Sequence, residues 1–183
     1  MKVLFTAEAI SKGGRSGTIQ NPEGLLDVTL GNPLEKGIEK RGPNPEMLFA
    51  GAYSACYHGA LVNAGKTLGM PIDDSTVRAM VSLIEDDKGG YRISVELHAQ
   101  ISSLNKTQVL RIMDEAHSTC PYSKALRGDA SVTLVVDKTE STRRSADPQV
   151  FSRVSARKKP SSKLSSSEVS AHEVISILHR HRM

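Results

Sequence analysis

The sequence predicts an α+β fold in which an antiparallel sheet packs around two long central helices. Residues 91–101 alternate strictly between apolar and polar side chains, which is typical of a half-buried strand. Residues 47–62 are apolar or small almost throughout, and the Asn44-Pro45 pair before them suits the start of a helix. Three expected strands precede this helix, and two strands, a second helix and a last strand follow it. That order favours antiparallel pairing beside helices in one domain.

The N-terminal segment predicts a three-stranded meander. Residues 3–9 alternate as a strand does, and Gly13-Gly14 supplies the positive backbone angles that a tight turn requires. Strands over residues 16–20 and 25–30 follow, with an Asn21-Pro22-Glu23-Gly24 turn between them. Each strand is therefore expected to pair with the next one along the chain.

The apolar run predicts a central helix that protein surrounds. Ser54 and His58 are its main polar interruptions, and a helix without a polar face is usually buried. We expect the helix to end near Gly69, with Pro71 beyond it as a stop. The run is too short and too interrupted to span a bilayer, so we expect a soluble protein.

The second half of the chain predicts a hairpin followed by a helix and a strand. Strands over residues 76–84 and 91–101 are joined by the Gly-containing stretch 86–90, and a short strand is expected over residues 131–136. Between them, Asn105 can cap a helix whose buried stripe is Val109, Met113 and Ala116. This helix carries Cys120 at its C-terminal end, where Pro121 prevents continuation.

Composition and charge divide the chain at residue 137. Residues 1–137 carry 14 Lys and Arg against 16 Asp and Glu, a net charge of −2, and residues 138–183 carry 10 against 4, a net charge of +6. Residues 1–137 are long enough to form one hydrophobic core. Because their net charge is close to zero, the charge gives no indication of nucleic-acid binding. The second part is a basic, Ser-rich tail that we expect to be disordered. With two cysteines and no apolar signal segment, we expect a cytoplasmic location.

A cysteine becomes a nucleophile only as a thiolate, which requires a positive neighbour or a helix N-terminus. Cys56 lies beyond the first turn of its predicted helix, so an external cation is needed. Arg15 follows the glycine pair of a tight turn and is the best candidate. Glu46 is available as the carboxylate that would hold it.

Four motifs then resemble those of the OsmC/Ohr family, in matching order over roughly residues 3–137. The Tyr after Cys-Pro and the Leu-Phe pair of the central helix are more similar to the organic hydroperoxide resistance (Ohr) branch than to the osmotically induced (OsmC) branch. The motifs are Gly13-Gly14-Arg15, Asn44-Pro45-Glu46-x-Leu48-Phe49-Ala50, Tyr53-Ser54-Ala55-Cys56 and Ala116-His117-x-x-Cys120-Pro121-Tyr122-Ser123.

The resemblance implies a lipoyl-dependent peroxidase that acts as an intertwined homodimer and reduces organic and fatty-acid hydroperoxides to alcohols. Cys56 would be the peroxidatic thiolate and Cys120 the resolving thiol, with a disulfide between them that a dithiol such as dihydrolipoamide, on a lipoylated protein, reopens. Arg15 would stabilise the thiolate, and Glu46 would hold Arg15. No bound cofactor is implied. Apolar walls for the peroxide are expected from Phe49, Tyr53 and Tyr122.

One geometric point extends the resemblance. Glu46 and Cys56 are ten residues apart on one predicted helix, a rise of roughly 15 Å. The two side chains cannot both reach one arginine along a straight helix. We therefore expect Arg15 and Glu46 to serve the Cys56 of a second copy of the chain.

Three stretches depart from the family pattern and bear on substrate preference and on how Arg15 is presented. They are Pro43, the charged loop over residues 35–41, and Lys124-Ala125-Leu126. They leave the cysteine pair unchanged, and the resemblance does not extend to the tail.

Other interpretations remain open from the residues alone. Two separated cysteines are commonly inert core thiols, and the aromatic residues are core by default. A zinc site from His117, Cys120, Cys56 and His58 is disfavoured, because His58 lies two residues from Cys56 and points away from it. His117 is then a hydrogen-bonded structural residue. The alternatives to the Ohr function are an OsmC-branch peroxidase and a binding protein whose basic tail docks an acidic partner.

Overall fold

The computed structural model describes residues 1–35 and 42–137 of the chain. The charged loop, beyond Glu35, and the basic tail over residues 138–183 lie outside the described residues. The described residues belong to one compact unit bounded by Met1 and Ser141. No helix among them is long and apolar enough to cross a membrane.

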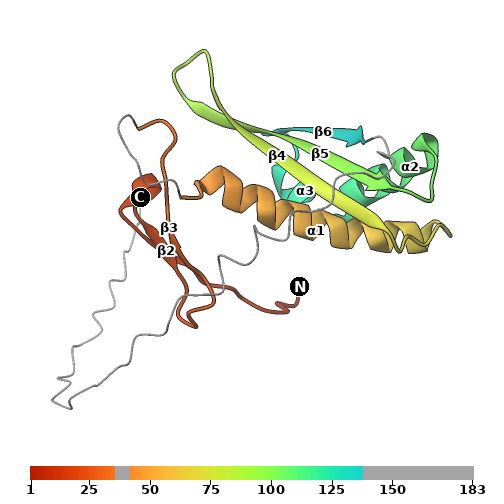
Figure 1. Cartoon of the computed structure of the whole chain (residues 1–183), viewed down its shortest axis with the longest axis horizontal. Helices are drawn as coiled ribbons and strands as arrows, with labels where there is room; N and C mark the ends of the chain where they lie inside the picture. Colours follow the sequence, from red (N-terminus) through yellow and green to blue (C-terminus); the bar gives the residue numbers. More distant parts are fainter. Residues whose placement is uncertain (36–41, 138–183) are drawn as a thin grey trace, which may run out of the picture. The chain divides into compact units, whose positions relative to one another are not determined.

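The described chain forms two three-stranded sheets and a set of helices (Figure 1). The first sheet has the strand order β1-β2-β3 and the second β4-β5-β6. The strands are β1 (Ile10–Lys12), β2 (Thr18–Gln20), β3 (Asp27–Thr29), β4 (Ser75–Glu85), β5 (Tyr91–Ile101) and β6 (Ser131–Val136). The helices are α1 (Pro45–Thr67), α2 (Lys106–Thr119) and α3 (Pro121–Leu126), with a 3-10 turn, η1 (Gly14–Ser16), between β1 and β2.

The N-terminal meander has the predicted antiparallel order, but its strands are shorter than expected. The strand predicted over residues 3–9 is wrong, because β1 begins only at Ile10. Ile10 pairs with Gln20, the last residue of β2, and the turn at Asn21-Pro22 follows at once. Residues before Ile10 therefore have no strand of this sheet opposite them. The predicted glycine turn is confirmed, with φ of 77° at Gly13 and 60° at Gly14.

The central helix α1 begins and ends where the sequence predicts. Asn44 accepts a hydrogen bond from the backbone N–H of Met47 at 2.8 Å, and Pro45 occupies the first turn. At the other end, Gly69 adopts a φ of 68°, and the N–H of Met70 bonds to the carbonyl of Gly65. This pattern closes the helix, because it satisfies carbonyls that the helix itself leaves free.

The second sheet corrects the expectation of purely antiparallel pairing. β4 and β5 form the predicted antiparallel hairpin, in register from Ser75 with Ile101 to Glu85 with Tyr91. β6, however, pairs with β5 in parallel. The chain leaves β5, passes through α2 and α3, and returns to β6 in the same direction, as a crossover connection requires. The sheet is therefore mixed.

The core forms where α1 and α2 pack on one face of the second sheet. Its fully buried side chains come from a stripe of α1, alternate residues of β5 and the predicted stripe of α2, joined by Cys120. The principal members are Tyr53, Tyr57, Leu61, Val95, Leu97, Ala99, Val109, Ile112, Met113 and Ala116. α2 has 14 residues against 23 in α1, so a second long central helix is not found in the described chain.

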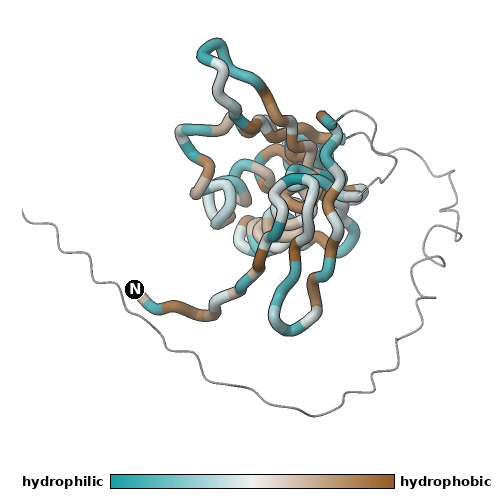
Figure 2. Tube along the Cα trace, turned by 90° about the vertical axis from the view of Figure 1, so that its left-hand side faces the viewer, coloured by the Kyte–Doolittle hydropathy of each residue, from teal (hydrophilic) through white to brown (hydrophobic). Residues whose placement is uncertain are grey.

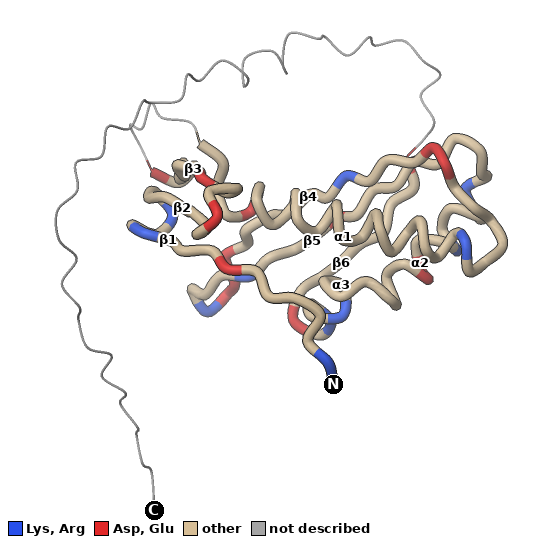
Figure 3. The backbone as a smooth tube through the Cα atoms, turned by 90° about the horizontal axis from the view of Figure 1, so that it is seen from below, with Lys and Arg blue, Asp and Glu red and all other residues tan. Residues whose placement is uncertain are grey.

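The helix α1 was expected to be surrounded by protein, but the described chain buries only part of its surface. Its Tyr53, Tyr57 and Leu61 are buried, but small residues on other faces are exposed, namely Gly51, Ala52, Ala55 and Gly59. Glu46 and Lys66 are the only Asp, Glu, Lys or Arg of α1, so the helix is mostly tan in Figure 3. The N-terminal segment, marked N in Figure 2, is also apolar and open, with Val3 at 79% and Phe5 at 83% exposure.

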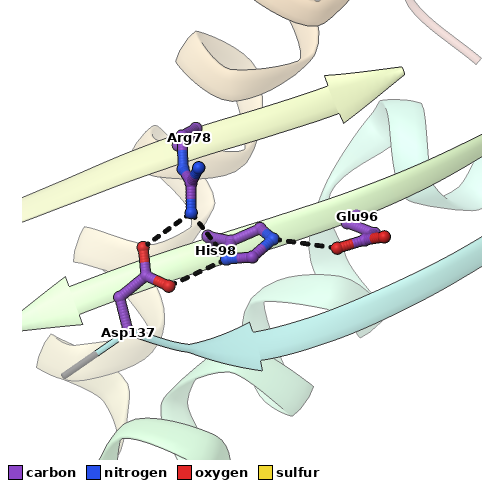
Figure 4. Close-up of polar contacts among 4 residues, drawn as sticks. All are labelled: Arg78, Glu96, His98 and Asp137. Atoms are coloured by element: carbon purple, nitrogen blue, oxygen red, sulfur yellow. Dashed lines mark hydrogen bonds and ion pairs between the residues drawn. The ribbon is translucent and has the colours of Figure 1, made fainter. Parts of the chain in front are cut away.

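A polar cluster on the sheet secures the end of β6 (Figure 4). His98 of β5 is buried, and its Nδ1 lies 2.8 Å from Asp137 and its Nε2 3.0 Å from Glu96. Arg78 of β4 donates to the other carboxylate oxygen of Asp137 at 3.2 Å. These bonds lower the pKa of Asp137, with the hydrogen bond from His98 as the largest cause. The cluster connects β4, β5 and the residue that follows β6.

Candidate active site

Two cysteines 64 residues apart in sequence meet where α1 passes the corner between α2 and α3. The Sγ atoms of Cys56 and Cys120 are 3.7 Å apart, and both residues are free thiols. Cys120 is completely buried, whereas Cys56 is only partly buried. The predicted proximity of the two sulfurs is confirmed, and the distance is short enough for a disulfide to form with a small movement.

Cys120 lies at the corner between two helices. It follows the last residue of α2 and precedes Pro121, the first residue of α3, so it flanks both helices. Pro121 ends α2 as predicted, yet it also begins α3, since its fixed φ suits a first helical position. The helix α3 was not predicted from the sequence.

Burial raises the pKa of the Cys56 thiol, and the neighbouring thiol of Cys120 raises it further. The backbone N–H of Tyr122, in the first turn of α3, acts in the opposite direction by hydrogen bonding to the sulfur. None of these principal influences is a cation. The Tyr122 amide is a feature that sequence reasoning missed, although Pro121 at a possible helix start was the available signal.

Arg15 and Glu46 form the ion pair that the sequence predicts. The Nη2 atom of Arg15 lies 2.6 Å from Oε2 of Glu46, and the Glu46 side chain is only 12% exposed. Among the described residues, neither side chain forms a hydrogen bond or ion pair with Cys56, and the Nε atom of Arg15 is buried without a partner. Next to Arg15, the Ser16 hydroxyl donates to Glu35 at 2.6 Å. The arginine is thus positioned by one carboxylate at the start of α1.

The three aromatic residues expected to line a peroxide pocket pack against one another. Phe49 and Tyr122 are stacked with ring centroids 6.0 Å apart, and Tyr53 lies within 5.8 Å of both. Tyr122 is 37% exposed and Tyr53 is completely buried. The structure therefore brings the three together, with Tyr53 in the interior and Tyr122 at the surface.

Tyr53 also makes a buried hydrogen bond that the sequence analysis did not predict. Its hydroxyl lies 2.8 Å from the Oγ of Ser123, which is 1% exposed. Burial raises the pKa of Tyr53, so the phenol stays protonated. The two residues are 70 positions apart in the sequence, so no local sequence pattern could predict that their hydroxyls form a hydrogen bond.

A groove of about 350 Å³ opens beside Cys56 and follows α1 toward its C-terminal end. Its lining residues on α1 begin at Cys56, whereas Phe49 lies seven residues earlier on the same helix. None of the three aromatic residues lines it. Its lining residues are Cys56, Gly59, Ala60, Asn63, Ala64, Thr67, Glu115, Thr119 and Pro121.

The histidines near the cysteines do not converge on them. The Nε2 atom of His58 lies 2.9 Å from the Ser75 hydroxyl, so the ring points toward the start of β4. The Nδ1 atom of His117 is buried and has no hydrogen-bond partner in the described part of the chain, which corrects the expectation of a hydrogen-bonded structural histidine. Burial lowers the pKa of His117 and keeps it neutral at pH 7. Over residues 1–35 and 42–137, no group of three His, Cys, Asp or Glu could hold a metal ion.

The model of the family described as OsmC-like protein matches residues 37–135, which include Glu46, Cys56 and Cys120. The chain belongs to the OsmC-like family. Arg15 precedes the matched stretch. The two cysteines that meet at 3.7 Å thus lie in the part of the chain that family members share.

Within the OsmC-like family, several of the similar proteins are organic hydroperoxide resistance (Ohr) proteins. The chain is 40% identical over 132 residues to OhrB of Bacillus subtilis, covering 72% of the chain and 96% of that protein. It is 39% identical over 138 residues to the organic hydroperoxide resistance protein of Xanthomonas axonopodis pv. citri, covering 74% and 96%. The crystal structure of B. subtilis OhrB aligns with a TM-score of 0.70, covering 74% of the chain and all of that structure. The predicted resemblance to the Ohr branch is therefore confirmed.

Proposed function

We propose that the protein is a thiol peroxidase that reduces organic hydroperoxides, fatty-acid hydroperoxides among them, to alcohols in defence against organic peroxide stress. The observation that carries this proposal is the pair of free thiols, Cys56 and Cys120, with their sulfurs 3.7 Å apart. The Ohr names of the similar proteins support the choice of organic hydroperoxides as substrates. In the same proposal the enzyme acts in the cytoplasm, where a reducing environment supplies dithiols.

The first half of the cycle oxidises the protein. The thiolate of Cys56 attacks the outer peroxide oxygen, the O–O bond breaks, and the alkoxide takes a proton to leave as the alcohol. Cys56 becomes a sulfenic acid. The Cys120 thiol then attacks this sulfur, a disulfide forms and water leaves. The partly buried Cys56 borders the groove and is the sulfur that a peroxide can reach.

The second half of the cycle reduces the disulfide with a dithiol such as dihydrolipoamide, carried by a lipoylated protein. One thiolate of the dithiol attacks Cys56, and Cys120 leaves as a thiolate. The second thiolate then attacks the mixed disulfide, which releases Cys56 and the cyclic lipoamide disulfide. Cys56 is the point of attack because Cys120 is completely buried.

The cation for Cys56 comes, in this proposal, from a second copy of the chain. The Arg15–Glu46 ion pair lies at the start of α1, and Cys56 is ten residues further along, roughly 15 Å by helical rise. A homodimer in which the N-terminal segments are exchanged would bring Arg15 of one copy to Cys56 of the other. It would also cover the exposed small residues of α1.

The catalytic assignment is tested by following consumption of an organic hydroperoxide with dihydrolipoamide as reductant. We expect Cys56→Ser to lose the activity entirely. Cys120→Ser should still reduce one equivalent of peroxide and then accumulate over-oxidised Cys56. Equal turnover by wild type and Cys56→Ser would refute the assignment.

The shared site is tested by mixing two inactive variants. A heterodimer of Arg15→Ala and Cys56→Ser chains contains one site with both native residues, if those residues come from different copies. Random exchange of subunits should therefore restore about one quarter of wild-type activity, since half the dimers are mixed and each has one of two sites intact. If the mixture stays inactive while size-exclusion chromatography confirms exchange, each site belongs to a single chain.

A further inference from the structure

The hydrogen bond between Tyr53 and Ser123 connects α1, which carries Cys56, to α3, which begins directly after Cys120. Tyr53 precedes Cys56 by one turn of α1, and Ser123 follows Cys120 by three residues in α3. The bond is 2.8 Å long, and both side chains are at least 99% buried, so water does not compete for it. It therefore lies one helical turn from each sulfur.

α3 packs against α1 through the ring of Tyr122, which stacks on Phe49, and through the Ser123 hydroxyl, which bonds to Tyr53. α3 has six residues and follows a sharp corner at Cys120, and Ser123 is its only buried residue. A helix of this length does not hold its place by local hydrogen bonds alone. Its N-cap is Cys120, whose sulfur lies 3.7 Å from that of Cys56, so a shift of α3 alters both sulfur environments.

We propose that Tyr53 and Ser123 form a positioning clamp that holds Cys120 against Cys56, so that the disulfide closes before Cys56 is over-oxidised. The inference rests on the proposed function. Two reactions compete for the sulfenic acid. Attack by Cys120 forms the disulfide and releases water, whereas a second hydroperoxide transfers an oxygen, giving a sulfinic acid and an alcohol. Only the first reaction depends on the distance between the sulfurs, which is 3.7 Å with the clamp in place.

Tyr53→Phe removes the phenolic oxygen and retains the ring. We expect the sulfinic acid formed on Cys56 per turnover to rise about fivefold, the factor that a hydrogen bond of typical net strength supplies. Cumene hydroperoxide serves as the oxidant at increasing concentrations, and mass spectrometry of the Cys56 peptide measures the product. Ser123→Ala should have the same effect, and the double variant should be no worse than either single one, since both remove one interaction.

Tyr57→Phe is the matched control. Tyr57 is also a completely buried tyrosine of α1, and its hydroxyl donates to the carbonyl of Met113 at 2.7 Å. That bond connects α1 to α2 and not to α3. The control should lose stability by a similar amount yet leave the fraction of over-oxidised Cys56 at the wild-type value.

A second measurement needs no peroxide. The reduced protein is equilibrated with mixtures of reduced and oxidised glutathione, and the fraction with a Cys56–Cys120 disulfide is measured. Loss of the clamp should shift the equilibrium about fivefold toward the dithiol, because the sulfurs are less often in bonding position. Tyr57→Phe should not shift it.

The outcomes separate the inference from the function. If wild type consumes cumene hydroperoxide and Tyr53→Phe and Ser123→Ala over-oxidise no more than Tyr57→Phe, the clamp is refuted and the peroxidase stands. If wild type does not consume the peroxide, the proposed function fails, and the glutathione equilibrium alone decides the clamp. Unchanged disulfide equilibria in both variants would then overturn it.

Discussion

The N-terminal meander and the helix-sheet body, from α1 to β6, differ in how they are stabilised. The body contains every buried apolar residue of the described chain except Leu30, which follows β3. The meander has strands of three residues each, and its side chains are exposed or half-buried. Yet the meander carries Arg15, whereas the body carries both cysteines. The body can therefore fold around its own core, and the meander needs another surface to become fixed.

The largest expected effect is a difference in unfolding free energy between a core substitution in the body and a substitution in the meander. Ile112→Ala removes a completely buried side chain of α2 and should lower the free energy of unfolding by about 3 kcal/mol. Ile19→Ala, at a half-buried position of β2, should cost less than about 1 kcal/mol. Urea unfolding followed by circular dichroism measures both. Equal losses would show that the meander is part of the same core.

The next effect concerns Arg15, the positive charge that we propose the meander provides for the Cys56 thiolate. Arg15→Ala should lower the rate of peroxide reduction by about 100-fold, as loss of a charge that stabilises a reacting anion commonly does. Because Glu46 is only 12% exposed, its carboxylate loses its partner in a mostly buried place and the melting temperature should also fall, so the rate is measured well below it. Stopped-flow kinetics with an organic hydroperoxide provides the measurement.

Arg78→Ala is the control for this experiment, because Arg78 is an exposed arginine whose partners, His98 and Asp137, lie in the polar cluster of the sheet. It should leave the rate unchanged. Comparable losses in both arginine variants would indicate a general effect of net charge and would remove the special role of Arg15.

A smaller effect on the rate of peroxide reduction tests whether the turn backbone after Arg15 positions its side chain. Gly17 follows η1, and a Cβ atom there would meet the backbone oxygen of Lys12. Gly17→Ala must therefore shift the turn, and we expect the peroxide rate to fall about tenfold through misplacement of the guanidinium. Ser11→Ala, an exposed change on β1, should have no effect. If Gly17→Ala retains full activity, the turn does not position the arginine.

The smallest effect concerns the polar cluster at the end of β6. The pKa of Asp137 is lowered in the folded protein, so its carboxylate stabilises the fold above the ordinary aspartate pKa of about 4 and ceases to do so as the pH falls through the lower folded value. Asp137→Asn should cost about 0.5–1 kcal/mol at pH 7 and almost nothing near pH 2. Unfolding curves at both pH values measure the difference.

The sequence predicted best those elements whose signals are local. α1 has a capping residue, a proline at its first position and a glycine at its end, and all three act within one turn of the helix. The β4–β5 hairpin combines strict alternation with a glycine turn, and its second strand has the predicted bounds. Such signals are sufficient because the interactions that they describe form between neighbours in the chain.

Features that depend on distant partners were predicted less well. The alternation of residues 3–9 suggested a strand, but a strand forms only beside another, and β2 ends too early to supply one. The parallel pairing of β6 and the short helix α3 follow from how the chain returns to the sheet, which no local pattern records. In the site, the meeting of the two cysteines was expected from family resemblance and not from spacing, and the Tyr53–Ser123 bond had no signal at all.

The positions of Cys56 and Cys120 have a consequence for the endurance of the protein itself. A bond between these two sulfurs would close a ring that contains the end of α1, the whole β4–β5 hairpin and α2. Closing a ring of 64 residues restricts the unfolded chain by about 4 kcal/mol in the chain-entropy model. In the proposed cycle, the disulfide-bonded protein would therefore melt at a higher temperature and resist proteolysis better than the reduced protein. Its thermal stability would then report the fraction of the protein that is oxidised.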